Sequence, residues 1–400
     1  MTNRLPYATA GQPSLPRLLP ALMPAITAVA GVAALAAALV WTPLLVIAAN
    51  RLVPGVPVTG WATLGPALVA ILACAAFASA LLAASPGRRA GAVALILILA
   101  AAGLFAWGLG HGAAVRMEGR PPAARAGLGA GVWFVALWFA TALGLATRRI
   151  RLSGLGAGVA GLLVLALVLA GRAGAFDALS LAVEYAARRE TVQAALWEHL
   201  ALASGGLGLA IPAVAVLSLW RRGQDLVGIV IGGVQVVPAV ALLGALVAFT
   251  GGLLRALPAL RDLGVSALGP APAIVGIAAY LLLPLWRGLA AALRAPDSAS
   301  LDAAKALGLT RAQILLRLRL PLGAPQLVGA LRVATVQALG LATLGALIGA
   351  GGLGRIVFDG MAQFAPDLIL LGAIPIVAVS LMAERGLSAL EGSLRARRPA

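Results

Sequence analysis

The polar segment 295–321 holds the most specific arrangement of side chains in an otherwise apolar chain. It reads APDSASLDAAKALG and continues LTRAQILLRLRLP. Pro296, followed by Asp297 or Ser298, is a helix-start signal, and Gly308 is a helix-stop signal. The pattern therefore predicts a short helix that lies outside the membrane.

A second short helix is expected to follow this glycine. Thr310 can cap it, and it is expected to end before Pro321, so that the two helices form a soluble hairpin. On the first helix a small apolar stripe lies opposite Asp302 and Lys305, because residues three or four apart share a helix face. Such a face suits docking into a groove on a partner protein. The stripe consists of Leu301, Ala304 and Leu307 or Gly308.

The rest of the chain has the composition of a membrane protein. Of its 400 residues 62% are apolar and 11% are charged, and the mean hydropathy is +1.01. A bilayer core of ~30 Å needs about 20 mostly apolar residues per helix, which predicts an all-α polytopic membrane protein with about ten transmembrane helices. The candidate spans are 22–48, 61–84, 90–109, 127–146, 153–170, 197–219, 226–249, 271–292, 327–349 and 367–390.

The net charge of +17 is explained by membrane topology rather than by nucleic acid. The basic residues are arginines and one lysine, in short clusters between apolar segments. Arg-rich loops face the cytoplasm, so their distribution predicts that both termini lie on the cytoplasmic side of the bacterial inner membrane. Arg287 and Arg332 fall within spans and are expected to snorkel toward the cytoplasm. Cys74 stands alone, and no metal site is predicted.

The charged segment from Gly171 to His199 separates two sets of about five spans each. Its amphipathic pattern from Leu179 to Leu196 predicts a helix at the outer, periplasmic surface. The expected organisation is an accessory N-terminal bundle at 1–175, a junction at 176–196, a transport core at 197–392 with a cytoplasmic loop at 293–325, and a basic cytoplasmic tail at 393–400.

The hairpin segment resembles the cytoplasmic signature of permeases of binding-protein-dependent ABC importers. That signature reads Glu-Ala-Ala, three residues, Gly, nine residues, Ile, one residue, Leu-Pro, and this chain has Asp for Glu and Leu for Ile at the same spacing. The resemblance implies a type I ABC importer permease core whose coupling helices seat in a cleft of the ATPase. The alternative is an ordinary basic loop that only sets orientation. The matching residues are Asp302, Ala303, Ala304, Gly308, Leu318, Leu320 and Pro321.

Three further blocks resemble the osmoprotectant branch, whose permeases handle glycine betaine, choline and related quaternary ammonium compounds. They begin at Gly233, Tyr280 and Ala342 and read GVQVVPAVALLG, YLLLPLWR and ATLGALIGAGGLG. The resemblance covers roughly Trp197 to Leu390 and implies alternating-access import of such a solute. The first five spans look like an extension found in some members. Methionine and phosphonate permeases share a similar glycine-rich block, so another small solute such as methionine remains an alternative.

Polar residues within the core spans are candidates for the translocation pathway. Proline in a span removes a backbone hydrogen bond and frees a carbonyl that must face protein or a water-filled cavity. A role in lining the pathway and a role in interhelical hydrogen bonding are both open for each residue. The candidates are Gln235, Pro238, Tyr280, Thr335, Gln337 and Thr343.

Four glycines, Gly349, Gly351, Gly352 and Gly354, close the ninth candidate span. They fit either a flexible turn or close backbone packing at a periplasmic gate. A phosphate-binding loop is excluded, because this run follows a membrane helix rather than a strand.

The sequence predicts a transport subunit without catalytic residues or its own ATPase site. Lys305 is the single lysine and does not lie in a nucleotide-binding motif. The chain is expected to bind no cofactor, with ATP and Mg on a partner ATPase. The resemblance implies further partners: a periplasmic or lipid-anchored substrate-binding protein, and a second copy or a sister permease. Membrane lipid surrounds the chain.

The rival class is an ion-coupled secondary transporter, which commonly needs a buried Asp or Glu. None of the thirteen acidic residues is expected to fill that role. Glu384 is expected to pair with Arg385, and the residues expected at loops or span edges are Asp225, Asp297, Asp302, Asp359 and Asp367. A membrane enzyme is weaker still, because His111 and His199 are expected to be satisfied interfacial histidines.

Overall fold

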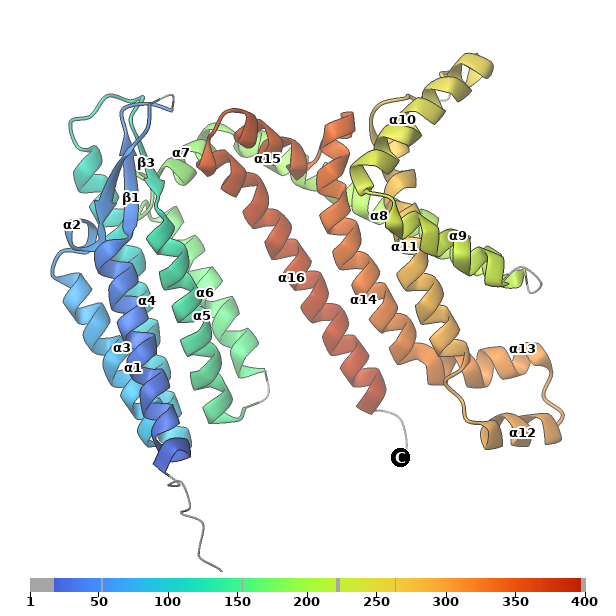
Figure 1. Ribbon diagram of the computed structural model, residues 1–400, viewed down its shortest axis with the longest axis horizontal. Helices are drawn as coiled ribbons and strands as arrows, with labels where there is room; N and C mark the ends of the chain where they lie inside the picture. Colours follow the sequence, from blue (N-terminus) through green and yellow to red (C-terminus); the bar gives the residue numbers. More distant parts are fainter. Residues whose placement is uncertain (1–17, 52, 153, 221–223, 263, 397–400) are drawn as a thin grey trace, which may run out of the picture. The chain divides into compact units, whose positions relative to one another are not determined.

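A computed structural model describes residues 18–51, 53–152, 154–220, 224–262 and 264–396 (Figure 1). Within them, ten helices are long and apolar enough to cross a membrane, which confirms the predicted number. The chain divides into two compact units, one ending at Val183 and the other beginning at Glu184. Some of the arginines that predict the orientation lie outside the described residues, namely Arg4, Arg17, Arg221 and Arg222. The last four residues of the expected tail lie outside them as well.

The N-terminal unit is a bundle of membrane helices around an apolar core. Side chains from three different helices, Ile71, Ile98 and Val135, are completely buried in it. Small residues such as Ala75 and Ala101 let these helices approach closely. The helices are α1 (Leu18–Trp41), α2 (Gly60–Leu64), α3 (Ala67–Ala84), α4 (Arg88–Met117), α5 (Ala130–Ile150) and α6 (Leu155–Arg172). The next helix, α7 (Ser180–Ala187), crosses the boundary between the two units.

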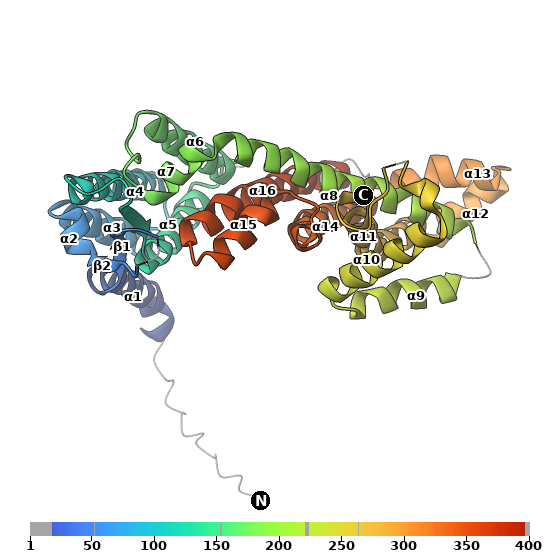
Figure 2. The same cartoon turned by 90° about the horizontal axis from the view of Figure 1, so that it is seen from above.

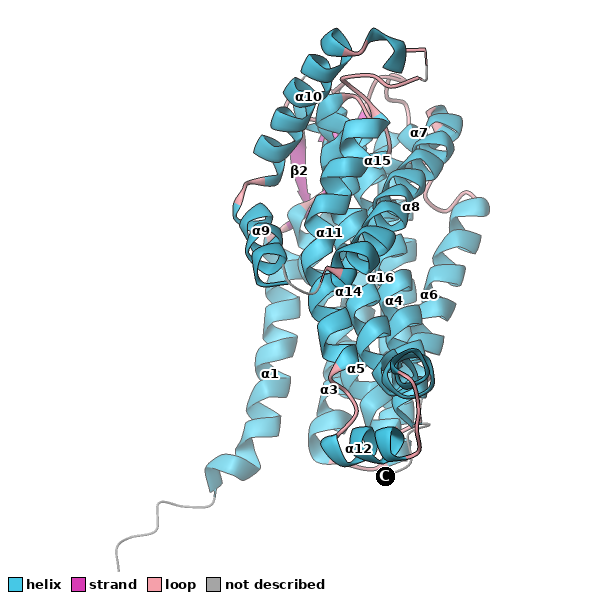
Figure 3. Ribbon diagram, turned by 90° about the vertical axis from the view of Figure 1, so that its right-hand side faces the viewer, coloured by secondary structure: helices cyan, strands magenta, loops and turns pink. Residues whose placement is uncertain are grey.

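A three-stranded antiparallel sheet, which the sequence did not reveal, caps this bundle. It consists of β1 (Pro43–Ala48), β2 (Val56–Thr59) and β3 (Arg125–Leu128) in the order β2-β1-β3, with Leu45 opposite both Val58 and Leu128. Figure 3 shows the strands as the only magenta segments among the described residues. The expected span 22–48 is therefore wrong at its end. The residue before a proline disfavours the helical conformation, so α1 stops ahead of Pro43.

The C-terminal unit carries the segments with specific motifs. α11 packs against α8 and α14, and α16 packs on α14 (Figure 2). Its helices are α8 (Arg189–Leu219), α9 (Gln224–Val236), α10 (Ala239–Ala256), η2 (Pro258–Leu260), α11 (Pro270–Leu293), α12 (Ser298–Ala306), α13 (Arg311–Ile314), η3 (Leu315–Arg319), α14 (Leu320–Gly345), η4 (Ala346–Ile348), α15 (Leu353–Ala362) and α16 (Pro366–Ala396).

The expected amphipathic helix from Leu179 to Leu196 is not one helix. It is α7 and the first turns of α8, separated at Arg188, whose φ of −126° and ψ of 22° are not helical. The Arg188 guanidinium at this break pairs with the buried carboxylate of Glu184, four residues earlier. α8 consequently begins at Arg189, ahead of the expected start of the core at Trp197.

Glycine sets the distance between α11 and α14. A Cβ added at Gly288 of α11 would lie 2.0 Å from the Cβ of Ala330 on α14. A Cβ added at Gly340 of α14 would meet nothing within 4 Å. The backbones can therefore approach only because position 288 lacks a side chain.

We predict that Gly288→Ala destabilises the protein by about 1–3 kcal/mol through overpacking. The measurement is the thermal unfolding midpoint in detergent. Gly340→Ala is the matched control and should stay within about 1 kcal/mol of the wild type, because only helix propensity changes there. Equal midpoints for the two variants would contradict the close approach at Gly288.

Candidate functional site

The hairpin begins with a capped helix, as the sequence predicts. The Ser300 N–H donates to Asp297 Oδ1 at 2.6 Å, which caps α12. Hydrogen bonds from the Ser300 hydroxyl, which has the larger effect, and from the Ser300 backbone N–H lower the pKa of the Asp297 carboxyl. The capping carboxylate therefore stays ionised at neutral pH. At the other end Gly308 adopts a φ of +75°, and the N–H of Leu309 donates to the Ala304 carbonyl at 3.1 Å. This left-handed glycine turn ends the helix.

The second limb of the hairpin begins with a capping box at Thr310. The Thr310 N–H donates to Gln313 Oε1 at 2.8 Å, and the Gln313 N–H donates to Thr310 Oγ1 at 3.3 Å. The cap confirms the expectation, but the expected end before Pro321 is wrong. α13 runs through a π-helical turn into α14, giving one apolar helix from Arg311 to Ile348. Pro321 follows the π-helical turn inside this continuous helix, where its missing N–H removes one helical hydrogen bond.

The outer face of the hairpin differs in part from the expected stripe. Ala304 is buried, whereas Leu307 is 79% exposed and Leu316, on the second limb, is 63% exposed. Lys305 pairs with Asp302 at 2.8 Å on the surface. The hairpin therefore presents two separated leucines beside a neutral charge pair, which is an arrangement suited to an apolar groove on another protein.

The expected span 226–249 is wrong as a single helix, because the chain breaks between α9 and α10 at Val237 and Pro238. Pro238 has no N–H to continue the helix and disfavours helical geometry at Val237. The Tyr280 hydroxyl on α11 donates to the Val237 carbonyl, and Gln235 Nε2 donates to the Tyr280 carbonyl at 2.6 Å. The structure thus brings Gln235, Pro238 and Tyr280 together at an elbow.

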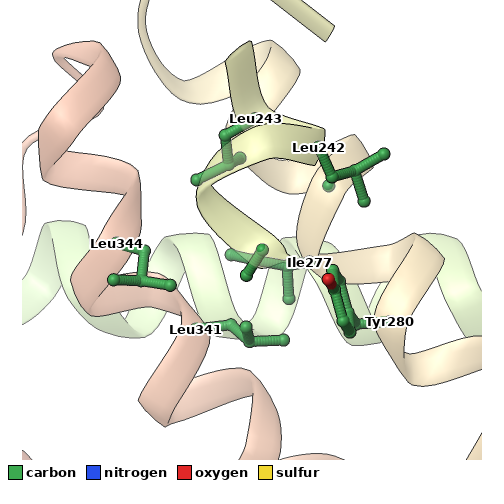
Figure 4. Close-up of a pocket in the computed structure, with 8 residues that line it drawn as sticks. Leu242, Leu243, Ile277, Tyr280, Leu341 and Leu344 are labelled. Carbon is green, nitrogen blue, oxygen red and sulfur yellow. The ribbon is translucent and has the colours of Figure 1, made fainter. Parts of the chain in front are cut away.

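A narrow apolar pocket lies beside this elbow, between α10, α11 and α14 (Figure 4). Tyr280 places its ring against the pocket, and the other lining residues are apolar. The other pathway candidates do not line it. Thr335 Oγ1 donates to the Leu331 carbonyl of its own helix at 2.8 Å, and Gln337 and Thr343 are half-buried on α14. The lining residues are Ala239, Leu242, Leu243, Gly276, Ile277, Tyr280, Leu341 and Leu344.

The glycine run that follows η4 forms both a turn and a close packing contact. Gly349, Gly351 and Gly352 have φ angles of +77°, +78° and +76°, which residues with a Cβ rarely adopt. Gly354 instead permits close packing, because a Cβ there would lie 2.1 Å from the Thr343 carbonyl oxygen. The first three glycines therefore form a turn, and the fourth lets α15 fold back onto α14.

Two neighbouring residues of α8, which the sequence did not single out for this role, hold the glycine turn. Glu198 Oε2 accepts a hydrogen bond from the Gly352 N–H at 2.8 Å. His199 Nε2 donates to the Leu339 carbonyl of α14 at 3.0 Å and is completely buried, so its hydrogen bond agrees with the satisfied histidine that the sequence predicts. His111, by contrast, is exposed and stacks on Trp107 with ring centroids 5.0 Å apart.

Charged side chains also meet inside the C-terminal unit. Glu384 pairs with Arg332 at 2.6 Å, so the expected pairing with Arg385 is wrong. Two carboxylates, Glu184 and Glu391, are buried rather than placed at loops, and each pairs with arginine. The expectation that no acidic residue would be buried is therefore wrong. Among the described residues no group of three or more His, Cys, Asp or Glu could hold a metal.

Ten apolar helices, a proline-broken span and a capped hairpin define a polytopic membrane permease. The chain belongs to the binding-protein-dependent transport system inner membrane component family, whose model matches residues 200–395. A second model, the ABC transporter permease YehY N-terminal domain, matches residues 25–182. The chain is thus a multi-pass inner-membrane permease of the ABC importer type, which confirms the predicted fold class and family.

Its relatives belong to the osmoprotectant branch. The carnitine transport permease protein OpuCB of Listeria monocytogenes is 30% identical over 49% of this chain and 84% of its own length. The choline transport system permease protein OpuBB of Bacillus subtilis is 28% identical over 47% and 80%. The osmoprotectant import permease protein OsmW of Salmonella typhimurium is 28% identical over 46% and 83%.

Among solved structures, the MetNI methionine ABC transporter in an inward-facing conformation is similar to this chain. The match has 23% sequence identity and a TM-score of 0.39, and it covers 48% of this chain and 93% of that one.

We predict that Gly351→Ala lowers the thermal unfolding midpoint more than Gly349→Ala. Both glycines have left-handed backbones, which cost an added Cβ about 1–2 kcal/mol. Only at Gly351 would the Cβ also lie 2.4 Å from Glu198 Oε2, whereas at Gly349 it would meet nothing within 4 Å. Combining each variant with Glu198→Ala should narrow the difference, and an unchanged difference would argue against the Glu198 contact.

Proposed function

We propose that this permease moves a quaternary ammonium osmoprotectant, such as glycine betaine, choline or carnitine, across the inner membrane by alternating access. The support is the branch of its relatives, whose names include carnitine and choline transport. The ring of Tyr280, beside a small apolar pocket at the elbow, adds a second argument. Aromatic rings attract quaternary ammonium groups through their π faces.

Energy enters this subunit through the hairpin. The observation that carries the proposal is the continuity of the hairpin with α14, since a force on the hairpin acts directly on a membrane-spanning helix. Leu307 and Leu316 supply the exposed apolar contacts that seat in the ATPase groove. The residues assigned to coupling are Asp302, Ala303, Ala304, Gly308, Leu318, Leu320 and Pro321.

ATP and Mg are bound by a separate ATPase, on the cytoplasmic side, where both termini of this chain also lie. The arginines beside the hairpin agree with this orientation. A periplasmic or lipid-anchored protein delivers the solute, and a second copy or a sister permease completes the complex. The accessory bundle at 1–175, the junction at 176–196 and the core at 197–392, with its loop at 293–325 and tail at 393–400, are the corresponding parts.

Alternating access requires parts of the core that move. The elbow of Gln235, Pro238 and Tyr280 and the pocket beside it lie on the translocation pathway, with Thr335, Gln337 and Thr343 on the adjoining helix. The glycine turn of Gly349, Gly351 and Gly352, with Gly354, forms the periplasmic gate. Both regions are irregular backbone inside or beside the membrane, where departures from helix line a cavity or serve a function.

The test is uptake by the protein reconstituted in liposomes with the ATPase and the binding protein of the same genome. Labelled glycine betaine, choline, carnitine and methionine are compared with ATP, without ATP and with an ion gradient alone. We expect ATP-dependent uptake of the quaternary ammonium compounds and little uptake of methionine. Uptake on an ion gradient without the ATPase would refute the proposal, and preference for methionine would refute the substrate class.

Gly308→Leu should abolish ATP-driven uptake while membrane insertion stays normal. A leucine at a φ of +75° strains the turn by about 1–2 kcal/mol and adds bulk to the docking surface. Gly264→Leu is the matched control, because Gly264 has a φ of +78° but lies outside the hairpin. Normal uptake by Gly308→Leu, or an equal loss in the control, would contradict the coupling role.

A further inference from the structure

α14 and α16 are joined by charge as well as by apolar packing. Arg332 lies about 18 Å along α14 from Leu320, the residue at which the hairpin enters that helix. Glu384 and Glu391 lie on one face of α16, two helical turns apart, which is about 10 Å. The hairpin end of α14 and the C-terminal end of α16 lie on the same side of this unit (Figure 1).

The Arg332 guanidinium bridges the two carboxylates unequally. Its Nη1 donates to Glu384 Oε1 at 2.6 Å, whereas its Nε lies 3.3 Å from Glu391 Oε2 without a well-aligned hydrogen bond. Arg395, four residues beyond Glu391, pairs with Glu391 as well. The network thus contains two acids and two bases, and it is neutral as a whole.

The neighbouring backbone is shaped to admit this network. A Cβ added at Gly329, one turn before Arg332, would lie 3.3 Å from all three atoms of the Glu391 carboxyl group. The side chain of Glu391 is 10% exposed and that of Arg332 is 30% exposed. Apolar side chains would join two membrane helices without the desolvation cost of such charges. Ionisable groups that are paired and partly buried within membrane segments are therefore expected to serve a function.

We propose that Arg332 is the positioning residue that passes movement of the hairpin from α14 to α16, which rests on the proposed role of the hairpin in coupling. A planar guanidinium can form strong hydrogen bonds to carboxylates in more than one direction. When α14 shifts toward its hairpin end, Arg332 leaves Glu384 and completes its hydrogen bond to Glu391. The two carboxylates thereby define two axial positions of α14 against α16.

The experiment uses the full chain in liposomes with its ATPase and binding protein, and measures ATP hydrolysis and solute uptake on the same preparations. Wild-type uptake tests the proposed function by itself. In Arg332→Met we expect hydrolysis within about twofold of the wild type and uptake lower by about tenfold, the scale of losing one hydrogen bond to a charged group. Arg332→Lys keeps the charge without the planar fork, so its uptake should be intermediate.

Two further variants separate coupling from simple stability. Glu384→Gln keeps the size of the side chain and should show the same loss of uptake with hydrolysis retained. Arg287→Met removes an exposed arginine of α11 and should match the wild type in both measurements. The proposal is overturned if hydrolysis and uptake fall in parallel in Arg332→Met and Glu384→Gln, or if uptake is unchanged in both variants. In either case, ATP-driven uptake by the wild type still upholds the proposed function. Absence of ATP-driven wild-type uptake overturns both.

Discussion

Every departure from helix inside a membrane protein must find a partner for its backbone groups within the protein, because hydrocarbon offers none and each unpaired group costs several kcal/mol. The C-terminal unit meets this constraint at two breaks among its described residues. At the elbow, the Tyr280 hydroxyl donates a hydrogen bond to the carbonyl of Val237. At the glycine turn, the Glu198 carboxylate accepts a hydrogen bond from the N–H of Gly352. These hydrogen bonds join the elbow to α11 and the glycine turn to α8.

α14 is the helix at which these contacts converge. It continues the hairpin at one end, bears Arg332 within its first half, and is held near its other end by His199 through the carbonyl of Leu339. It therefore contacts α16 through ions and α8 through a buried histidine.

Local signals in the sequence predict the hairpin well and the long-range contacts poorly. Asp297, Gly308 and Thr310 act within a few residues of themselves, so their capping roles follow from the sequence. The pairing of Glu384 with Arg332 joins residues 52 positions apart, and that of His199 with Leu339 joins residues 140 apart. No periodicity in a single sequence specifies which helices become neighbours, and helices in lipid are apolar on all sides.

Strand content was missed for a related reason. The run from Pro43 to Ala48 is short and apolar, and periodicity alone does not separate a strand from a helical segment in such a run. What decides the outcome is pairing with β3, which lies far along the chain.

The edges of that sheet carry one more consequence. β2, at one edge, contains Pro57, which has no N–H to offer to an additional strand, and β3, at the other edge, is already bridged by Leu179. Open edges invite strand exchange between neighbouring molecules, and proline is a recognised guard against it. Crowded copies of this protein in a membrane are therefore protected against association through β-sheet extension, whatever assembly their helices form.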